Sequence, residues 1–310
     1  MIYDPESLRR LVAIVETNNM RAAAELVGVT QPALTRSLKL LEAAAGGVLF
    51  ERRDRGLHLT SLGKLVHAHA RHLLREHQLA EAELRALRTG EQGQLRVAAA
   101  PVWMTTILPP VVAKVHHNYP KLLIKLKSAN YSEAVLGLKE GEFDVFFGGF
   151  QRRESLPSFL VRKPLFNSRL VIVARSGHPI HDRRVQAEDL IQQRWLSYQS
   201  EIAYLDTINT TLEDSSEVSV TASLQCDSML TALELLRHGD YLAVLPSSFL
   251  NSENGRGIDV VATDLPAIRF ASGPIYRRSL EANLAMQMLL EAAQIQVASH
   301  SNWEPRFSPR

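Results

Sequence analysis

Apolar residues recur at helical spacing near the start of the chain. A first stripe marks the buried face of one helix: Leu8, Leu11, Val12 and Val15. Asp4 supplies a capping carboxylate in front of it, and Pro5 suits the first helical position because its missing N–H would be unpaired there anyway. The pattern predicts a helix that begins at residue 5.

The next apolar pattern is interrupted and then restarts. It runs through Ala22, Ala23, Leu26 and Val27 to Gly28, a residue suited to the left-handed position after a helix. Thr30 can cap a third helix, whose inner stripe consists of Leu34, Leu38 and Leu41. Two helices joined by a short turn that contains glycine are typical of a helix-turn-helix, whose second helix enters the major groove of DNA.

The outer face of this third helix carries residues that can read bases. Glutamine pairs with adenine, arginine with guanine, and small side chains contact the thymine methyl. We therefore expect DNA contacts from Thr30, Gln31, Pro32, Ala33, Thr35, Arg36 and Lys39. The alternative is an ordinary solvated helix face.

The segment "VLFERRDRGLHLTSLG" predicts a β-hairpin wing, with a short apolar strand, a charged turn and alternating leucines. Its arginines, Arg52, Arg53 and Arg55, can contact the phosphate backbone, which supplies affinity without base choice.

Residues 61–88 predict a long helix capped by Thr60. Its seam contains Leu62, Leu65, Val66, Ala70, Leu73, Ala80, Leu84 and Leu87. At about 1.5 Å per residue the helix is too long for one small domain to cover. We expect it to pair with the same helix of a second copy, which would place two recognition helices about one DNA turn apart. The alternative is a solvated linker helix.

The run "RAAAELVGVTQPALTRSLKLLE", followed by "LFER" and "LTSLGKL", resembles the N-terminal region of LysR-type transcriptional regulators. The resemblance continues more loosely through the chain. It implies a cytoplasmic regulator that binds double-stranded operator DNA, dimerises through the linker helix, assembles further into a homotetramer, and has RNA polymerase as a possible partner. The segment "EAAAGG" departs from the family, which leaves the start of the wing less defined.

After a polar linker at residues 89–94, strands and helices alternate. We expect strands at 95–99, 122–127, 143–147, 170–174, 195–198, 218–222, 242–245 and 268–276, with helices at 110–118, 132–140, 187–193, 202–212, 228–238 and 279–297. This alternation predicts a largely parallel sheet in two α/β lobes. The fold class is thus α/β behind an all-α-type winged helix-turn-helix.

The expected domains follow from this reading. They are the winged helix-turn-helix at 1–60, the linker helix at 61–90, an effector domain at 91–300 and a tail at 301–310. Within the effector domain, lobe I comprises 91–163 and 267–300, and lobe II comprises 164–266. The family resemblance implies a likeness to periplasmic binding proteins, with a small effector held between the lobes.

Ligands of such sheets bind beyond the carboxyl ends of strands, near helix N-termini that favour anions. The expected effector residues are Ala100, Pro101, Val102, Trp103, Met104, Tyr131, Gly148, Gly149, Phe150, Tyr198, Gln199, Cys226 and Asp227. Ala100 and Val102 stand where the family often has hydroxyl residues, and an indole follows. We therefore hypothesise that the effector is an aromatic or apolar carboxylate. The equal alternative is that Trp103 belongs to the core.

Composition narrows the possible classes. The length of 310 residues and the 45% hydrophobic content fit a folded protein of two or three domains. The single cysteine, Cys226, excludes an internal disulfide, fits the cytoplasm, and lacks a resolving partner for redox sensing. No stretch reaches about 18 uncharged apolar residues, so no membrane segment is expected. The first 90 residues hold 13 basic and 10 acidic side chains and are only mildly basic.

Two other classes remain as alternatives. A solute-binding protein would account for the lobes but not for the N-terminal motif. A Ser/Lys hydrolase is suggested by Ser61 and Lys64, yet S-D-N and K-T-G partner motifs are absent. His67, His69 and His72 scatter around the helix without metal-ligand spacing. We expect no enzyme activity, no metal and no cofactor.

Overall fold

The computed structural model describes residues 4–53, 56–89, 93–150, 155–182, 184–198, 204–216, 219–250, 252–266 and 268–299. The chain forms two compact units. The first comprises Met1–Leu95 together with Lys121–Leu123 and Val135–Asp144, and the second comprises the remaining residues. The predicted domain limits differ from this division because residues near 122 and 140 group with the N-terminal segment.

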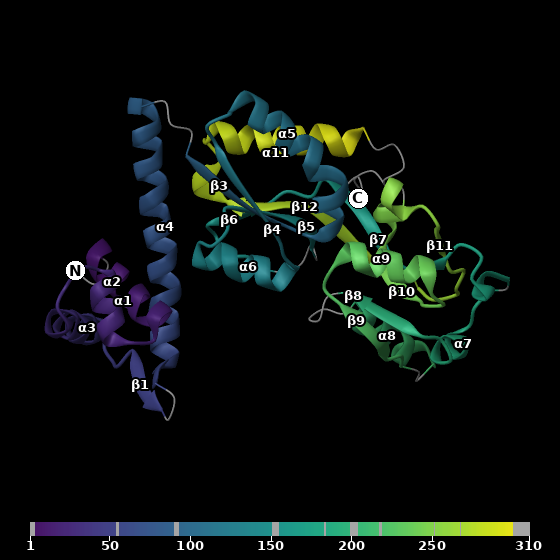
Figure 1. The fold of residues 1–310 in the computed structure, drawn as a ribbon, viewed down its shortest axis with the longest axis horizontal. Coiled ribbons are helices and arrows are strands. Elements are labelled where there is room, and N and C mark those ends of the chain that lie inside the picture. Colours follow the sequence, from purple (N-terminus) through teal and green to yellow (C-terminus); the bar gives the residue numbers. More distant parts are fainter. Residues whose placement is uncertain are drawn as a thin grey trace. The chain divides into compact units, whose positions relative to one another are not determined.

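Residues 4–89 of the first unit form three short helices, a hairpin and one long helix (Figure 1). The elements are α1 (Pro5–Thr17), α2 (Met20–Leu26), α3 (Gln31–Ala45), β1 (Phe50–Arg53), β2 (Gly56–Leu59) and α4 (Ser61–Thr89). The helix-turn-helix, the wing and the long helix are thus confirmed.

Local hydrogen bonds explain where these helices begin and end. Asp4 accepts the backbone N–H of Ser7 at 3.0 Å, and Thr30 accepts that of Ala33 at 3.4 Å, as the sequence predicts. Gly28 has φ +69°, which fits the turn between α2 and α3. Asn18 also has a positive φ, 47°, and ends α1. Asn19 then caps α2 by accepting two backbone N–H groups.

The helical core of this unit has two adjoining parts. One part contains residues of α1, α3, the segment before the wing, and α4: Leu8, Leu11, Leu41, Leu49, Val66 and Ala70. The other lies between α1, α2 and α3: Ala13, Ile14, Ala23, Ala24 and Leu34. The predicted apolar stripes therefore meet in a single small core, except for Leu26, which is 62% exposed.

The effector region begins with lobe I. Its elements are β3 (Gln94–Ala99), a π-helical turn η1 (Trp103–Ile107), α5 (Leu108–Asn118), β4 (Leu123–Ser128), α6 (Tyr131–Glu140), β5 (Val145–Phe150) and β6 (Leu160–Arg162). The chain returns to this lobe with β12 (Ile268–Arg277), η4 (Arg278–Leu280) and α11 (Leu284–Ala298). Helices α5 and α11 lie side by side over the sheet (Figure 1).

Lobe II holds the intervening elements. They are β7 (Phe166–Arg175), η2 (Pro179–Asp182), α7 (Ala187–Ile191), β8 (Trp195–Tyr198), α8 (Tyr204–Ser216), β9 (Ala222–Cys226), α9 (Met229–His238), β10 (Ala243–Pro246), α10 (Ser247–Leu250), η3 (Glu253–Gly255) and β11 (Ile258–Val260).

The main sheet has the order β10-β7-β12-β5-β3-β4. The expectation of a largely parallel sheet is wrong: β12 runs antiparallel to β5, β6 and β7, and β10 and β11 run antiparallel to β7. Parallel pairing occurs between β3 and β5 and between β8 and β9. The reason is that β7 and β12 are the long strands on which the chain leaves lobe I and returns, so they run in opposite directions.

Two predicted boundaries in the effector region are also wrong. The strand expected at 218–222 is β9, which begins at Ala222. Val220 is buried, but its N–H and C=O bond to the side-chain amide of Asn209, so it does not join the strand ladder. The last helix begins at Leu284, where Asn283 accepts the N–H of Met286, and not near residue 279.

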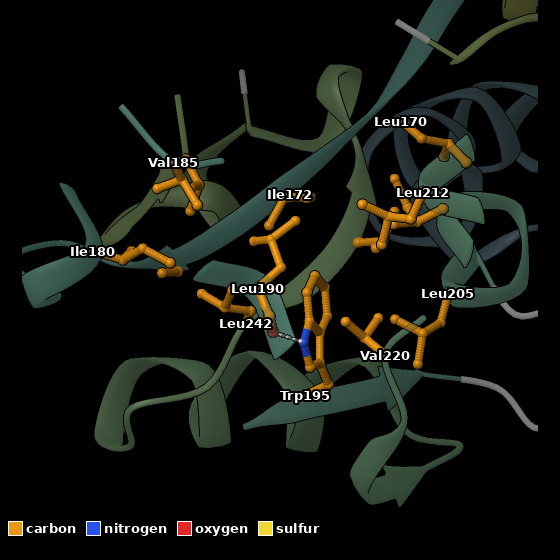
Figure 2. Packing of buried hydrophobic residues seen from close by; sticks show 14 residues of the cluster. Leu170, Ile172, Ile180, Val185, Leu190, Trp195, Leu205, Leu212, Val220 and Leu242 are labelled. Atoms are coloured by element: carbon orange, nitrogen blue, oxygen red, sulfur yellow. Dashed lines mark hydrogen bonds between the residues drawn. The ribbon is translucent and has the colours of Figure 1, made fainter. Parts of the chain in front are cut away.

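The centre of lobe II is an apolar cluster around Trp195, Leu190 and Leu242 (Figure 2). The indole N–H of Trp195 donates to the carbonyl of Leu190 at 2.9 Å, which satisfies the buried polar group. Figure 2 shows Ile172 of β7 pointing into the same cluster. The cluster thus joins β7, β8, α7 and α8 in the core of lobe II.

Among the described residues, no helix is long and apolar enough to cross a membrane.

Candidate DNA interface and effector site

Helix α3 has one buried side and one exposed side. Leu34 and Leu41 lie in the core, while Ser37 is buried and accepts a hydrogen bond from Arg10 Nη1 at 3.2 Å. The predicted DNA-contacting residues lie on the other side, where all are exposed except the half-buried Thr35: Thr30, Gln31, Pro32, Ala33, Thr35, Arg36 and Lys39. The predicted residues therefore share the solvent-facing side of α3.

The wing is fixed at both ends. Before β1, the carboxylate of Glu42 accepts the N–H of Leu49 at 2.8 Å, and Gly46 ends α3 with φ +80°. In the hairpin, Asn18 Oδ1 accepts the N–H of Leu57 at 3.2 Å. The segment "EAAAGG" thus leads into a defined strand.

The wing arginines are only partly described. In the hairpin register Arg52 pairs with Leu57 and Arg53 pairs with Gly56. Arg55 and the side chains of Arg52 and Arg53 lie outside the described residues. Asn18 is a positioning residue that the sequence reasoning missed, because a lone asparagine after a helix gives no signal of a contact 39 residues away.

The apolar residues of helix α4 differ in exposure. Val66 and Ala70 pack into the winged-helix core. Leu65, Leu73 and Leu84 are instead exposed by 57%, 39% and 61%. The helix thus contributes to the core of its own unit and also carries exposed leucines in the single chain.

The histidines of α4 are not gathered around a common point. Among the described residues, no group of three or more His, Cys, Asp or Glu side chains is arranged to hold a metal ion. Burial, reinforced by Arg71, lowers the pKa of His67, while Glu16 acts in the opposite direction. His67 is therefore favoured in its neutral form.

The predicted effector residues fall into two groups. The first group joins the lobes: Val102, from the loop after β3, belongs to one apolar cluster with Tyr198, Met229 and Phe249 of lobe II. Cys226 is half-buried against the same cluster. The structure therefore brings together three of the residues that the sequence singled out: Val102, Tyr198 and Cys226.

The second group lies in lobe I. Trp103 is 1% exposed, and its indole N–H donates to Ser272 Oγ at 2.8 Å. Its ring packs against Phe147 and Phe166 at centroid distances of 5.0 and 5.8 Å. Ser272 in turn donates to the carbonyl of Gly148 at 3.0 Å. Trp103 therefore lies buried in lobe I, and Ser272 is a hydrogen-bond partner that the sequence did not indicate.

Other predicted residues lie at the carboxyl ends of strands. The rings of Tyr131 and Phe146 pack in a T-shaped arrangement with their centroids 6.3 Å apart. The Arg162 guanidinium lies over the Phe150 ring, 5.4 Å from its centroid. Gly148 and Gly149 have no room for a Cβ atom, because the Phe146 and Phe270 rings would lie 2.2 and 2.7 Å away. These glycines are thus required by aromatic packing.

The remaining predicted residues differ in exposure. Pro101 is buried, Ala100 and Met104 are half-buried, and Asp227 is exposed. Gln199 lies outside the described residues.

The helix N-termini at this site are already capped by their own side chains. Asn130 and Glu133 form a reciprocal pair at the start of α6, at 2.9 and 3.0 Å. Ser228 accepts the N–H of Thr231 at the start of α9. Burial raises the pKa of the Cys226 thiol, which disfavours the reactive thiolate.

These features define a class: a winged helix-turn-helix with a long helix and a two-lobed α/β domain. The profile "Bacterial regulatory helix-turn-helix protein, lysR family" matches residues 5–64, and "LysR substrate binding domain" matches residues 88–298. The chain belongs to the LysR family of DNA-binding transcriptional regulators with an effector-binding domain.

Relatives agree with this assignment, and a solved structure shares the fold. The chain is 29% identical over 195 residues to the HTH-type transcriptional regulator GalR of Pseudomonas putida, covering 63% of this chain and only 49% of GalR. It is 27% identical to the SDS degradation transcriptional activation protein of a Pseudomonas species, covering 86% and 83%. Full-length CbnR complexed with its target DNA has a TM-score of 0.59 at 21% identity, covering 94% and 99%. The curated relatives are regulators and not enzymes.

Proposed function

We propose that α3 reads operator DNA through Gln31, Ala33, Thr35, Arg36 and Lys39, supported at its start by Thr30 and Pro32. Their shared exposure on one side of a helix whose other side is core supports this assignment. Arg52, Arg53 and Arg55 of the wing would hold phosphates. A protein that binds DNA lies in the compartment that holds the DNA, and we propose that this compartment is the cytoplasm.

The operator would be bound by a homodimer. The observation that supports this is the exposure of Leu65, Leu73 and Leu84 on α4, which a second copy of the helix can cover. A homotetramer and a contact with RNA polymerase are further proposals taken from the family. Sedimentation of the full chain tests the dimer, and a monomer at micromolar concentration would refute it.

The effector is proposed to bind between the lobes and to shift their relative position. The apolar or aromatic body of the ligand is proposed from the apolar character of the junction, where Val102 and Tyr198 are buried in one cluster, and the acid group is proposed from the helix ends. Trp103 is not used in this argument, because its buried indole N–H is already bonded to Ser272. A ligand can shift the lobes only by its differential affinity for the two states.

One experiment tests the regulator directly. Purified chain is mixed with sheared genomic DNA of its source, and retained fragments are sequenced. We expect a few recurring fragments with a two-fold symmetric site. Uniform retention at every salt concentration would contradict sequence-specific reading.

A second experiment tests the effector class. Calorimetry with benzoate, succinate and gluconate compares an aromatic, a small hydrophilic and a sugar acid. We expect heat only with benzoate, and weaker binding by Val102→Thr, which places a hydroxyl in the apolar cluster. Binding of gluconate without benzoate would exclude the proposed class.

A further inference from the structure

A buried ion pair joins the linker helix to the turn before β5. Arg75 Nε donates to Asp144 Oδ1 at 2.9 Å, and Arg75 Nη2 donates to Asp144 Oδ2 at 2.6 Å. Asp144 is fully buried and Arg75 is 9% exposed. Four residues earlier, Arg71 Nη1 donates to Glu140 Oε2 at 2.8 Å, but both side chains there are about a quarter exposed, at 30% and 24%.

The turn that carries Asp144 is stiff. Gly141 has φ +75°, and the N–H groups of Glu142 and Phe143 both donate to the carbonyl of Gly137, at 2.7 and 3.2 Å. The Phe143 ring packs so closely on Gly137 that a Cβ there would be 2.4 Å away. These contacts fix the backbone next to Asp144 independently of Arg75.

The two partners belong to one compact unit but to distant parts of the sequence. Helix α4 and residues Val135–Asp144 are grouped together. The next residue after Asp144 is Val145, the first of β5, and β5 ends in Gly148, Gly149 and Phe150. A single strand thus connects the ion pair to residues that the sequence predicts at the effector site.

The chemistry of the pair favours a positioning role over a purely stabilising one. Transferring both charges from water into the protein interior costs free energy. A pair of well-packed apolar residues of similar size often gives equal or greater stability. The planar guanidinium makes two parallel bonds to the carboxylate, which fixes direction as well as distance. A lysine could supply the charge but not the two-point geometry.

We propose that the Arg75–Asp144 pair is the positioning contact that fixes the linker helix on the turn entering β5, so that displacement of β5 by an effector reaches the DNA-binding segment. The inference rests on the proposed function. Arg75 contacts neither DNA nor effector in this mechanism and acts through α4.

The test uses the full chain with Arg75→Lys and its matched control Arg71→Lys, the same substitution one helical turn away at the more exposed pair. Hydrogen exchange is measured on peptides covering residues 135–144. DNA bending is measured at saturating protein on a fragment retained by the wild type. Asp144→Asn is a second, stronger variant, and thermal unfolding verifies that each variant is folded.

We expect Arg75→Lys to increase exchange at residues 135–144 and to shift the bend angle, while Arg71→Lys changes neither. A merely structural role would lower the melting temperature but leave the bend of saturated DNA unchanged. Unchanged exchange would refute the contact itself, and increased exchange with an unchanged bend in both Arg75→Lys and Asp144→Asn would refute the coupling. An equal bend shift in Arg71→Lys would also refute the assignment.

The exchange measurement needs no DNA, so it separates this inference from the proposed function. If the wild type retains no fragment while its exchange responds as expected, the proposed DNA reading fails and the ion pair stands as a contact without a demonstrated role.

Discussion

The recognition helix and the junction between the lobes are both proposed binding regions, yet they are built in opposite ways. Helix α3 projects polar side chains into solvent from one continuous segment. The junction is apolar and collects Val102, Tyr198 and Cys226 from three separate segments. The difference shows that a DNA-reading surface needs only a well-capped helix on a small core, whereas a small-molecule site needs long-range packing to exist at all.

The largest effect expected is on the buried side of this comparison. Trp103→Ala should destabilise the effector domain by about 3–5 kcal/mol, because a large side chain leaves a cavity in a packed core. The unfolding transition of the N-terminal unit should stay in place. Calorimetry of the full chain, in which the two units can unfold separately, measures both.

Trp103→Phe is the matched control. It keeps an aromatic ring beside Phe147 but loses the hydrogen bond to Ser272, so a smaller loss of stability is expected. Unchanged stability in Trp103→Ala with altered benzoate binding would return Trp103 to the effector site.

On the exposed side, Arg36→Ala should leave stability unchanged and weaken operator binding by about 1–3 kcal/mol. The cause is the loss of a contact to a base edge or phosphate. Gel shift on a retained fragment measures it, at fixed salt. Arg256→Ala removes an arginine that is similarly exposed, by 78%, in lobe II, and should have no effect. Equal losses in both variants would point to general charge.

A smaller effect is expected where the wing meets the helices. Asn18→Gly keeps the left-handed backbone but removes the acceptor for the Leu57 N–H. We expect weaker DNA binding by about 0.5–1.5 kcal/mol, the range for one hydrogen bond. Asn18→Asp keeps an acceptor oxygen and should lose less, and an unaffected Asn18→Gly would show that the wing holds its place without this bond.

The smallest effect is a pH dependence of the N-terminal unit. Burial lowers the pKa of His67, so the unfolded chain binds the proton more readily than the folded one. The N-terminal unit should therefore keep its full stability above about pH 6.5, the ordinary pKa of histidine, and lose stability as the pH falls below it. Melting temperatures from pH 8 to pH 5 measure the slope.

His67→Gln should flatten that slope without affecting the transition of the effector domain. Burial also lowers the pKa of His178 in lobe II, so His178→Gln should flatten the acid slope of the other transition alone. A slope that persists in His67→Gln would assign the acid sensitivity to another group.

The sequence by itself determined the winged helix-turn-helix. Its caps at Asp4 and Thr30, the turn glycine and the helical stripes act within a few residues of each other, so local rules suffice. The same rules identified α4, the lobes and the exposed side of α3.

Only the tertiary structure decided which residues share a site. Trp103 and Ser272 are 169 residues apart, and Arg75 and Asp144 are 69 apart, and nothing in the local pattern of either residue names its partner. The antiparallel course of β7 and β12 depends likewise on how the chain passes between lobes. The periodicity of apolar side chains indicates which face of a helix or strand is buried. Which segment covers that face depends on packing between residues that are distant in the sequence.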